Sequence, residues 1–251
     1  MFKTFLHIIL WGAAIALILF SLGFSARQYR QTRCVGLVVN VSDSAQYRFI
    51  DNDDVERWIE KKYNGVFGKR LDSINTRAIE AGLEKLQAIG HAQVYTTLAS
   101  RTGRDKGGSL VVRIEQRKPI FRVFTSGLDY YMDNEGNVMN WTPKYTARVI
   151  LVGGSVSRKF ARETLVPLVS YIGSDDFLKA QIDQIYVDDD GDLTMIPRIG
   201  DQRIEFGKAD GYQIKFRNLK ALYTEGFRHG GWSKYKCINL KYRNQIVCTK
   251  K

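Results

Sequence analysis

The chain has 251 residues and a formal net charge of +12 at pH 7. This length fits one large or two small domains, and 44% hydrophobic residues with only four prolines exclude a disordered tail. Three cysteines without a C-x-x-C pair exclude a disulfide scaffold and argue against a structural zinc site. The charge indicates an anionic partner: nucleic acid, a membrane surface or an acidic protein.

Residues 5–24 contain no Asp, Glu, Lys or Arg. Twenty helical residues match the ~30 Å hydrocarbon core of a bilayer, so this segment predicts an uncleaved transmembrane helix. A cleaved signal peptide, whose apolar region is usually ~7–15 residues long, and a buried core helix are the alternatives. The predicted membrane-anchor side chains are aromatic: Phe5, Trp11, Phe20 and Phe24.

The orientation of this helix does not follow from local charge. Lys3 lies in the short segment 1–4 before the helix, and three arginines lie in the linker 25–33 after it. A positive-inside count alone would place the linker in the cytoplasm, but large domains cross membranes largely regardless of charge.

A compact α+β unit is predicted over residues 34–119. Alternating Val35, Leu37, Val39 and Val41 indicate a half-buried strand. A helix capped near Asp51 should follow, with Val55, Trp58 and Ile59 on its apolar face, and a second helix from about Asn75, with Ile79, Leu83 and Leu86 at helical spacing and Gly90 as its end. Two alternating strands, around 92–98 and 110–114, then form a hairpin. The expected order is β-α-α-β-β.

Residues 120–251 are predicted to form a second, β-rich domain. Short apolar runs alternate with turn sequences at 133–136, 188–192 and 207–211. Helical periodicity occurs near 157–172 and 211–226. We expect a curved, mostly antiparallel sheet that carries two helices.

Two segments with superficial ligand-binding patterns do not meet the requirements of their motifs. The acidic run 188–192 has its glycine at the wrong position for a calcium loop and no glutamate at the required distance, so a hairpin turn is predicted there. Segment 200–208 has the wrong spacing for a phosphate loop, and Ala209 stands where Ser or Thr is required.

Catalytic motifs are not found either. The three histidines, His7, His91 and His229, belong to no zinc-protease pattern and lie near no nucleophile turn. We therefore expect no enzymatic activity, no metal and no cofactor.

The C-terminal segment predicts an exposed sheet edge. From Cys237 to Arg243 polar residues alternate with Ile238, Leu240 and Tyr242, a pattern typical of a final strand that can accept a strand from another chain. An ordinary edge strand protected by lysine and arginine is the alternative. Cys237 and Cys248 are expected to be free, buried thiols, although a tight turn at 243–244 would bring them opposite each other.

Taken together, the motifs resemble the bacterial cell-division family FtsQ/DivIB. The first unit resembles the POTRA module of that family, with Phe49-Ile50-Asp51 before its first helix and the run V-V-R-I-E-Q-R-K-P at 111–119 as its exit. Tyr130–Asp133 with Gly136, Phe206–Asp210 and Ile238–Tyr242 resemble three further motifs of the family in the same order. Asn239 departs from the pattern, because the family has an acidic residue there.

The resemblance implies a single-pass inner-membrane protein at the division septum, with its N-terminus in the cytoplasm and both domains in the periplasm. It implies a non-catalytic divisome scaffold, whose partners are the FtsB/DivIC-like and FtsL-like proteins. The partner would add a strand near the C-terminus, and the POTRA-like module would contribute further contacts through its open second-strand edge. Self-association is possible. The implied partner-binding residues are Lys241, Tyr242, Asn244, Gln245, Ile246 and Val247.

Two other hypotheses remain. A POTRA-containing envelope transport or assembly component would need further modules or a barrel, and a nucleic-acid-binding protein would need clustered cations with aromatics. The charge is localised: residues 1–40 carry +4, residues 41–219 carry 26 − 25 = +1, and residues 220–251 carry 8 − 1 = +7. This distribution favours lipid headgroups near the N-terminus and an acidic partner near the C-terminus over nucleic acid.

Overall fold

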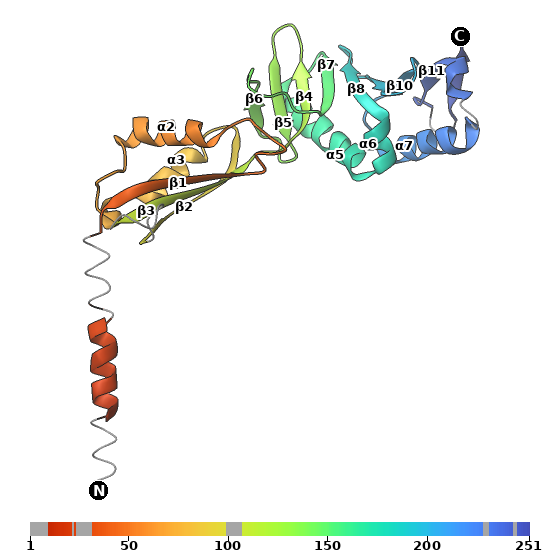
Figure 1. Ribbon diagram of the computed structural model, residues 1–251. Coiled ribbons are helices and arrows are strands. Elements are labelled where there is room, and N and C mark those ends of the chain that lie inside the picture. The colour runs from red at the N-terminus through yellow and green to blue at the C-terminus, as the bar shows by residue number, and fades with distance from the viewer. Residues whose placement is uncertain (1–9, 22, 24–31, 99–106, 228–230, 243–244) are drawn as a thin grey trace. The chain divides into compact units, whose positions relative to one another are not determined.

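The computed structural model describes residues 10–21, 23, 32–98, 107–227, 231–242 and 245–251. It divides the chain into two compact units, Met1–Gln116 and Arg117–Lys251, and each unit has a hydrophobic core of its own. The class is mixed α+β (Figure 1).

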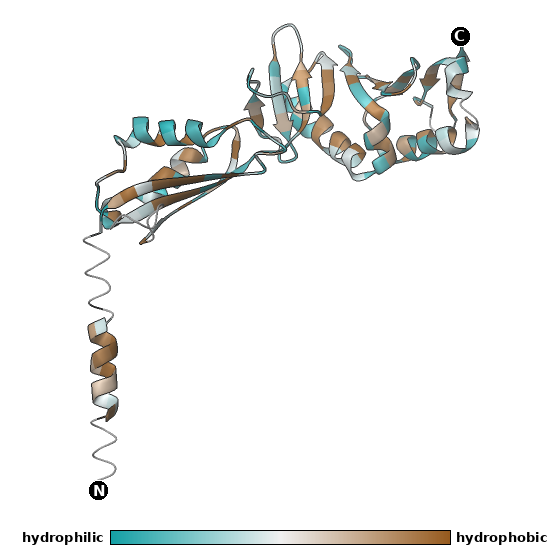
Figure 2. Ribbon diagram, in the orientation of Figure 1, coloured by the Kyte–Doolittle hydropathy of each residue, from teal (hydrophilic) through white to brown (hydrophobic). Residues whose placement is uncertain are grey.

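Residues 10–21 are helical and exposed, and they belong to neither core. Figure 2 shows this segment as mainly hydrophobic, and Trp11 and Phe20 are exposed on it, whereas Phe5 and Phe24 lie outside the described residues. None of the helices in the described part of the chain has both the length and the apolar character that crossing a membrane requires. The transmembrane segment therefore stays a prediction.

The first unit has the predicted order β-α-α-β-β. Its three strands form a sheet in the order β1-β3-β2, in which β1 is parallel and β2 antiparallel to the central β3. Both β1 and β2 are therefore outer strands. The strand bounds are β1 (Cys34–Ser42), β2 (Ile89–Thr97) and β3 (Gly108–Gln116).

A bulge at the start of β1 changes which side chains are buried. Leu37, Val39 and Val41 face the core as predicted, but Val35 is 38% exposed. The register to β3 shifts between Cys34 and Gly36, and an extra residue in a strand reverses the faces on which the residues before it lie. Cys34 is buried as a result.

The two helices of the first unit begin at the predicted caps. Asp51 and Asp54 form a capping box at the start of α2 (Asn52–Tyr63), and Asn75 caps α3 (Thr76–Leu83). A short 3₁₀ helix, Leu71–Ser73, precedes α3. The predicted end of the second helix at Gly90 was wrong: α3 ends seven residues earlier, and Gly90 lies in β2. The helical spacing of apolar residues continues beyond α3 to Leu86, because Leu86 packs against the core from the turn that follows the helix.

One buried amide joins the loop before α2 to the sheet. Gln116 is only 3% exposed, and its Oε1 accepts hydrogen bonds from the N–H groups of Phe49 (3.0 Å) and Ile50 (3.2 Å). Its Nε2 donates to the Tyr47 carbonyl at 2.7 Å. A buried side chain with these partners satisfies backbone groups that would otherwise lose their hydrogen bonds to water.

The second unit is built on a nine-stranded sheet in the order β12-β11-β10-β9-β8-β7-β4-β5-β6. Five neighbouring pairs are antiparallel (β12-β11, β10-β9, β9-β8, β4-β5 and β5-β6) and three are parallel. The strand bounds are β4 (Pro119–Phe124), β5 (Asp129–Asp133), β6 (Val138–Asn140), β7 (Ile150–Gly154), β8 (Ile182–Val187), β9 (Leu193–Pro197), β10 (Arg203–Gly207), β11 (Tyr235–Asn239) and β12 (Val247–Lys250).

Helices lie along one side of this sheet (Figure 1). Both predicted helical stretches exist, each with a π-helical turn, at Ala161–Leu165 and Leu222–Gly226. A further helix, α6, was missed; Asp175 caps it by accepting hydrogen bonds from the N–H groups of Phe177 and Leu178. The bounds are α4 (Arg158–Phe160), α5 (Val166–Ser174), α6 (Asp176–Gln181), α7 (Tyr212–Ala221) and a 3₁₀ turn at Gly231–Lys234.

The acidic sequences at 133–136 and 188–192 are hairpin turns, as predicted. Asp133 accepts hydrogen bonds from Asn137 N (2.8 Å) and from the Arg117 guanidinium (2.9 Å). Burial raises the pKa of Asp133, but hydrogen bonds from Arg117 and Asn137 outweigh burial and hold that pKa below its usual value. The carboxylate thus organises its own turn.

Candidate interaction edge at the C-terminus

The predicted C-terminal edge strand consists of two strands joined by a connection. β11 lies inside the sheet, parallel to β10 and antiparallel to β12. One edge of the sheet is β12, and its only neighbour among the described strands is β11. The segment predicted as a single edge strand therefore contains part of the inner strand β11 and part of the connection that leads to the edge strand β12.

Two hydrogen bonds show which backbone groups of β12 point outward. Lys251 N donates to Lys234 O at 3.1 Å, so its N–H points toward the β11 side. Leu240, the residue after β11, donates its N–H to Glu205 O of β10 at 2.8 Å, which leaves the odd-numbered residues of β11 to pair with β12. Because N–H groups alternate in direction along a strand, those of Thr249 point to β11, and those of Cys248 and Lys250 point to the open edge.

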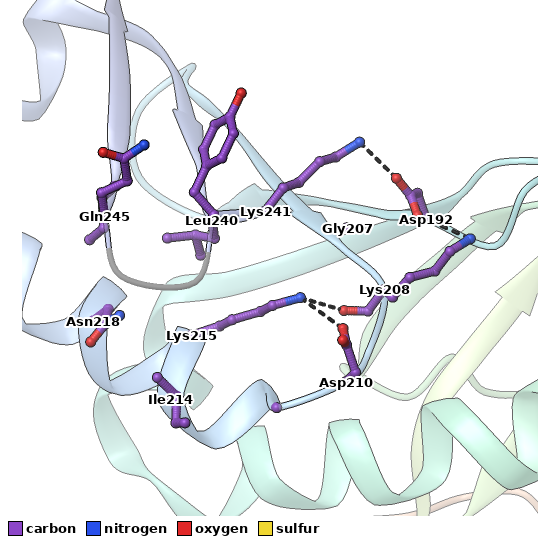
Figure 3. A pocket seen from close by; sticks show the side chains of 13 residues that line it. Asp192, Gly207, Lys208, Asp210, Ile214, Lys215, Asn218, Leu240, Lys241 and Gln245 are labelled. Atoms are coloured by element: carbon purple, nitrogen blue, oxygen red, sulfur yellow. Dashed lines mark hydrogen bonds and ion pairs between the residues drawn. The ribbon is translucent and has the colours of Figure 1, made fainter.

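A groove of about 540 Å³ lies beside the connection (Figure 3). One wall comes from the segment between β10 and α7 together with the first turns of α7, and the other from the connection between β11 and β12. The lining residues are Asp192, Gly207, Lys208, Asp210, Gly211, Ile214, Lys215, Asn218, Leu240, Lys241, Tyr242, Gln245 and Ile246.

At one end of the groove, Asp192 holds two lysines. Its carboxylate oxygens lie 2.7 Å from Lys241 Nζ and 3.1 Å from Lys208 Nζ. These hydrogen bonds, the stronger from Lys241, keep the pKa of Asp192 below its usual value, and the same contact raises the pKa of Lys241. Both shifts favour the charged forms of Asp192 and Lys241, and the cluster contains two lysines for one carboxylate.

On the α7 side, Lys215 closes the end of β10. Its Nζ donates to the Lys208 carbonyl at 2.7 Å and the Phe206 carbonyl at 3.1 Å, and it pairs with Asp210 at 3.2 Å (Figure 3). Gly207 lies in the same segment with a φ of +72°, a conformation that favours glycine, and a Cβ there would lie 3.0 Å from Lys241 Cγ. A larger residue would strain the backbone here and displace the Lys241 side chain.

Asn239 stands where the FtsQ/DivIB motif has an acidic residue, and its side chain has a specific partner in Glu205. Its Nδ2 donates to Glu205 Oε2 on β10 at 2.7 Å, and its Oδ1 accepts from Lys241 N at 2.9 Å. An aspartate here would face a carboxylate across the strand pair. The amide is thus matched to Glu205 and fixes the start of the connection.

Four of the six predicted partner-binding residues line the groove: Lys241, Tyr242, Gln245 and Ile246. Val247 begins β12, and Asn244 lies outside the described residues. Tyr242 is 52% exposed, whereas Ile246 packs against the core.

The charged groove residues Asp192, Lys208 and Lys215 are among those that the sequence did not predict as binding residues. In the sequence these residues appear only as turn residues followed by lysines. They lie near Lys241 because of the order of the strands in the sheet, which local sequence does not record.

The two C-terminal cysteines are free, as predicted. Cys237 is paired in register with Thr249, and Cys248 with Ile238, so the two thiols lie on opposite faces of the sheet. Burial raises the pKa of both thiols. Cys237 is buried, but Cys248 is only partly so.

The described residues contain no cluster of three His, Cys, Asp or Glu side chains that could bind a metal ion. His91 is exposed, and its Nδ1 lies 2.9 Å from Glu84 in the first unit. The groove has lysines and carboxylates bound to one another, and its described lining residues include neither histidine nor cysteine. Its chemistry suits the binding of a chain with acidic and apolar side chains.

The fold and this edge define a class of protein in which a POTRA-like unit precedes a mixed-sheet domain with an open C-terminal strand. Comparison with family models agrees: residues 32–101 match a POTRA-like domain, and residues 118–249 match the FtsQ/DivIB C-terminal related family. The second match covers just over half of the chain, and the chain belongs to that family. A search of curated proteins found no match.

Proposed function

We propose that this chain is a non-catalytic, membrane-anchored scaffold of the bacterial cell-division machinery. It binds an FtsB/DivIC-like partner, and with it an FtsL-like protein, by adding a partner strand to β12. The observation that carries this proposal is the open edge of β12 beside the lysine-bearing groove, within the segment that matches the FtsQ/DivIB family.

The edge supplies affinity, and the groove supplies specificity. A partner strand would bond to the outward backbone groups of Cys248 and Lys250, while its next segment enters the groove. Lys241 and Lys208 favour acidic residues in that segment, and Ile214 and Ile246 offer apolar contact.

The anchor in this proposal is the apolar segment 5–24, with the N-terminus in the cytoplasm and residues 32–251 in the periplasm. The absence of charged side chains from 5–24 supports it. At the septum, such an anchor would hold the partner-binding edge close to the enzymes of wall synthesis.

Affinity purification of the full chain from membranes tests the proposal. We expect the coiled-coil partners of the FtsB/DivIC and FtsL type to be recovered, and a variant that ends at Gln245, which lacks β12, to lose them. Recovery of outer-membrane assembly or transport components in their place would favour the second hypothesis, a POTRA-containing envelope component.

Topology is tested separately with a C-terminal alkaline phosphatase fusion, because that enzyme requires export for activity. We expect an active fusion. Activity of a cytoplasmic reporter at the same position would contradict the proposed orientation.

A further inference from the structure

The first unit carries a basic loop with an exposed phenylalanine, at the place where the chain leaves toward the apolar segment. In this loop, residues 64–70, Val66 is buried at 1% exposure and the next residue, Phe67, is 55% exposed. Asn64, Gly65 and Gly68 all have positive φ, a backbone that only Gly and Asn adopt at low cost. The turn thus fixes Val66 in the core and presents Phe67 to the outside.

The loop is attached to the segment that precedes β1. Cys34 N donates to Lys69 O at 2.8 Å, Gly68 N to Cys34 O at 2.8 Å and Leu71 N to Thr32 O at 3.0 Å. The Arg33 guanidinium also donates to Gly68 O at 2.8 Å. The position of the loop is therefore set by residues 32–34.

The same surface is positively charged. Arg33, Lys69 and Arg70 are exposed, and Arg70 is paired with Asp72 at 2.7 Å, which leaves an excess of two positive charges. Lys61 and Lys62 in the last turn of α2 lie immediately before the loop in the chain. An exposed aromatic ring among cations is typical of a surface that inserts into the headgroup region of an anionic membrane.

Chain length limits the distance between this loop and the apolar segment. Only seven residues separate Phe24 from Thr32, a span of at most about 28 Å when fully extended. If residues 5–24 lie in a membrane, the loop is held near its surface.

We propose that loop 64–70, together with Arg33, is a second membrane contact, in which Phe67 enters the headgroup region and Arg33, Lys69 and Arg70 bind anionic lipid headgroups. This proposal rests on the membrane anchor proposed above. The new element is that the first unit contacts the bilayer surface directly, in addition to its covalent link to the anchor.

Sedimentation with vesicles tests this contact without the anchor. Residues 32–251 contain both cores in full, so this fragment can be used. We expect it to bind vesicles of phosphatidylcholine and phosphatidylglycerol, to lose binding at high salt, and to bind pure phosphatidylcholine vesicles far more weakly.

Two loop variants and one control locate the contact. We expect Lys69→Ala to weaken binding about fivefold and Phe67→Ser about tenfold. Lys85→Ala is the matched control, because Lys85 is exposed beyond the end of α3, near the start of β2 and at the far end of the sheet. Circular dichroism checks that each variant is folded.

Unchanged binding of both loop variants would overturn the proposal, and so would an equal loss in Lys85→Ala or equal binding to neutral vesicles. The anchor is tested on its own by alkaline extraction of membranes that contain the full chain. Release of the full chain by alkali, together with lipid binding by the fragment, would contradict the anchor and leave the loop contact standing.

Discussion

Lys241 Nζ lies 2.7 Å from Asp192 Oδ2, although the two residues are 49 positions apart in the chain. This ion pair joins the connection before the edge strand to the turn between β8 and β9. Because Lys241 is exposed and Asp192 is only partly buried, water screens the pair, which contributes at most about 1 kcal/mol to stability. Because the pair lies at one end of the groove, we expect it to affect partner binding more than folding.

Replacing Lys241 should therefore weaken partner binding without unfolding the protein. We expect Lys241→Ala to change the free energy of unfolding by less than about 1 kcal/mol and to lower affinity for the FtsB/DivIC-like partner about tenfold. Urea unfolding and isothermal titration calorimetry measure the two quantities. Lys179→Ala, an exposed lysine on α6, is the control. Equal affinity of both variants would exclude Lys241 from the interface.

The ion pair should not respond to pH in the physiological range. The folded pKa of Asp192 is depressed, so its contribution is complete above the unfolded pKa of about 3.9 and is lost as pH falls through the lower, folded value. We expect the affinity difference between wild type and Asp192→Asn to stay constant from about pH 6 to 8. A difference that grows across that interval would mean that another group controls the groove.

Asn239→Asp should destabilise the second unit in a pH-dependent way. The change replaces the donor to Glu205 with a second carboxylate, and the repulsion raises the pKa of the pair. We expect a loss of about 2 kcal/mol at neutral pH that shrinks as pH falls toward 5. Thermal unfolding at several pH values measures it.

Asn239→Ala is the control for this effect, because it removes the hydrogen bond without adding charge. Its loss should stay nearly constant over the same pH interval. A parallel pH dependence in both variants would contradict the pairing of residue 239 with Glu205.

Gln116 should be important for the stability of the first unit. Gln116→Ala leaves the buried N–H groups of Phe49 and Ile50 without their acceptor, a loss of about 3 kcal/mol. Gln116→Glu keeps the acceptor but buries a carboxylate whose pKa is raised, so its destabilisation should increase as pH rises through that pKa. Hydrogen exchange of the β1 and β3 amides measures both. Wild-type protection in Gln116→Ala would show that the loop is held by other contacts.

The sequence predicted those parts of the fold that depend on neighbouring residues. The caps at Asp51 and Asn75, and the inward positions Leu110, Val112 and Ile114, follow from local chemistry and strand alternation. Gln116 continues the same alternation, so its burial could have been predicted, although its partners on the loop before α2 could not.

Features that depend on long-range pairing were missed. Val35 is exposed because a bulge against β3 reverses its face, and no local pattern records that bulge. Lys241 and Tyr242 were predicted to continue the strand because their alternation continues that of β11, but β11 ends at Asn239 and pairs with both β10 and β12. The contact of Lys241 with Asp192 likewise depends on the order of the four strands β8 to β11 in the sheet, which cannot be read from local sequence.

The central claim, strand addition at β12, is tested most directly by two adjacent proline variants. Thr249 and Lys250 are both exposed, so neither change removes core packing. The Lys250 N–H points to the open edge, and the Thr249 N–H points to β11. Proline removes a donor in each case.

Co-purification of the FtsB/DivIC-like partner with the two variants is the decisive measurement, with thermal unfolding beside it. We expect Lys250→Pro to keep the wild-type melting temperature and lose the partner. Thr249→Pro should melt at a lower temperature, because it loses a bond within the sheet. Full recovery of the partner with a folded Lys250→Pro variant would contradict strand addition at β12.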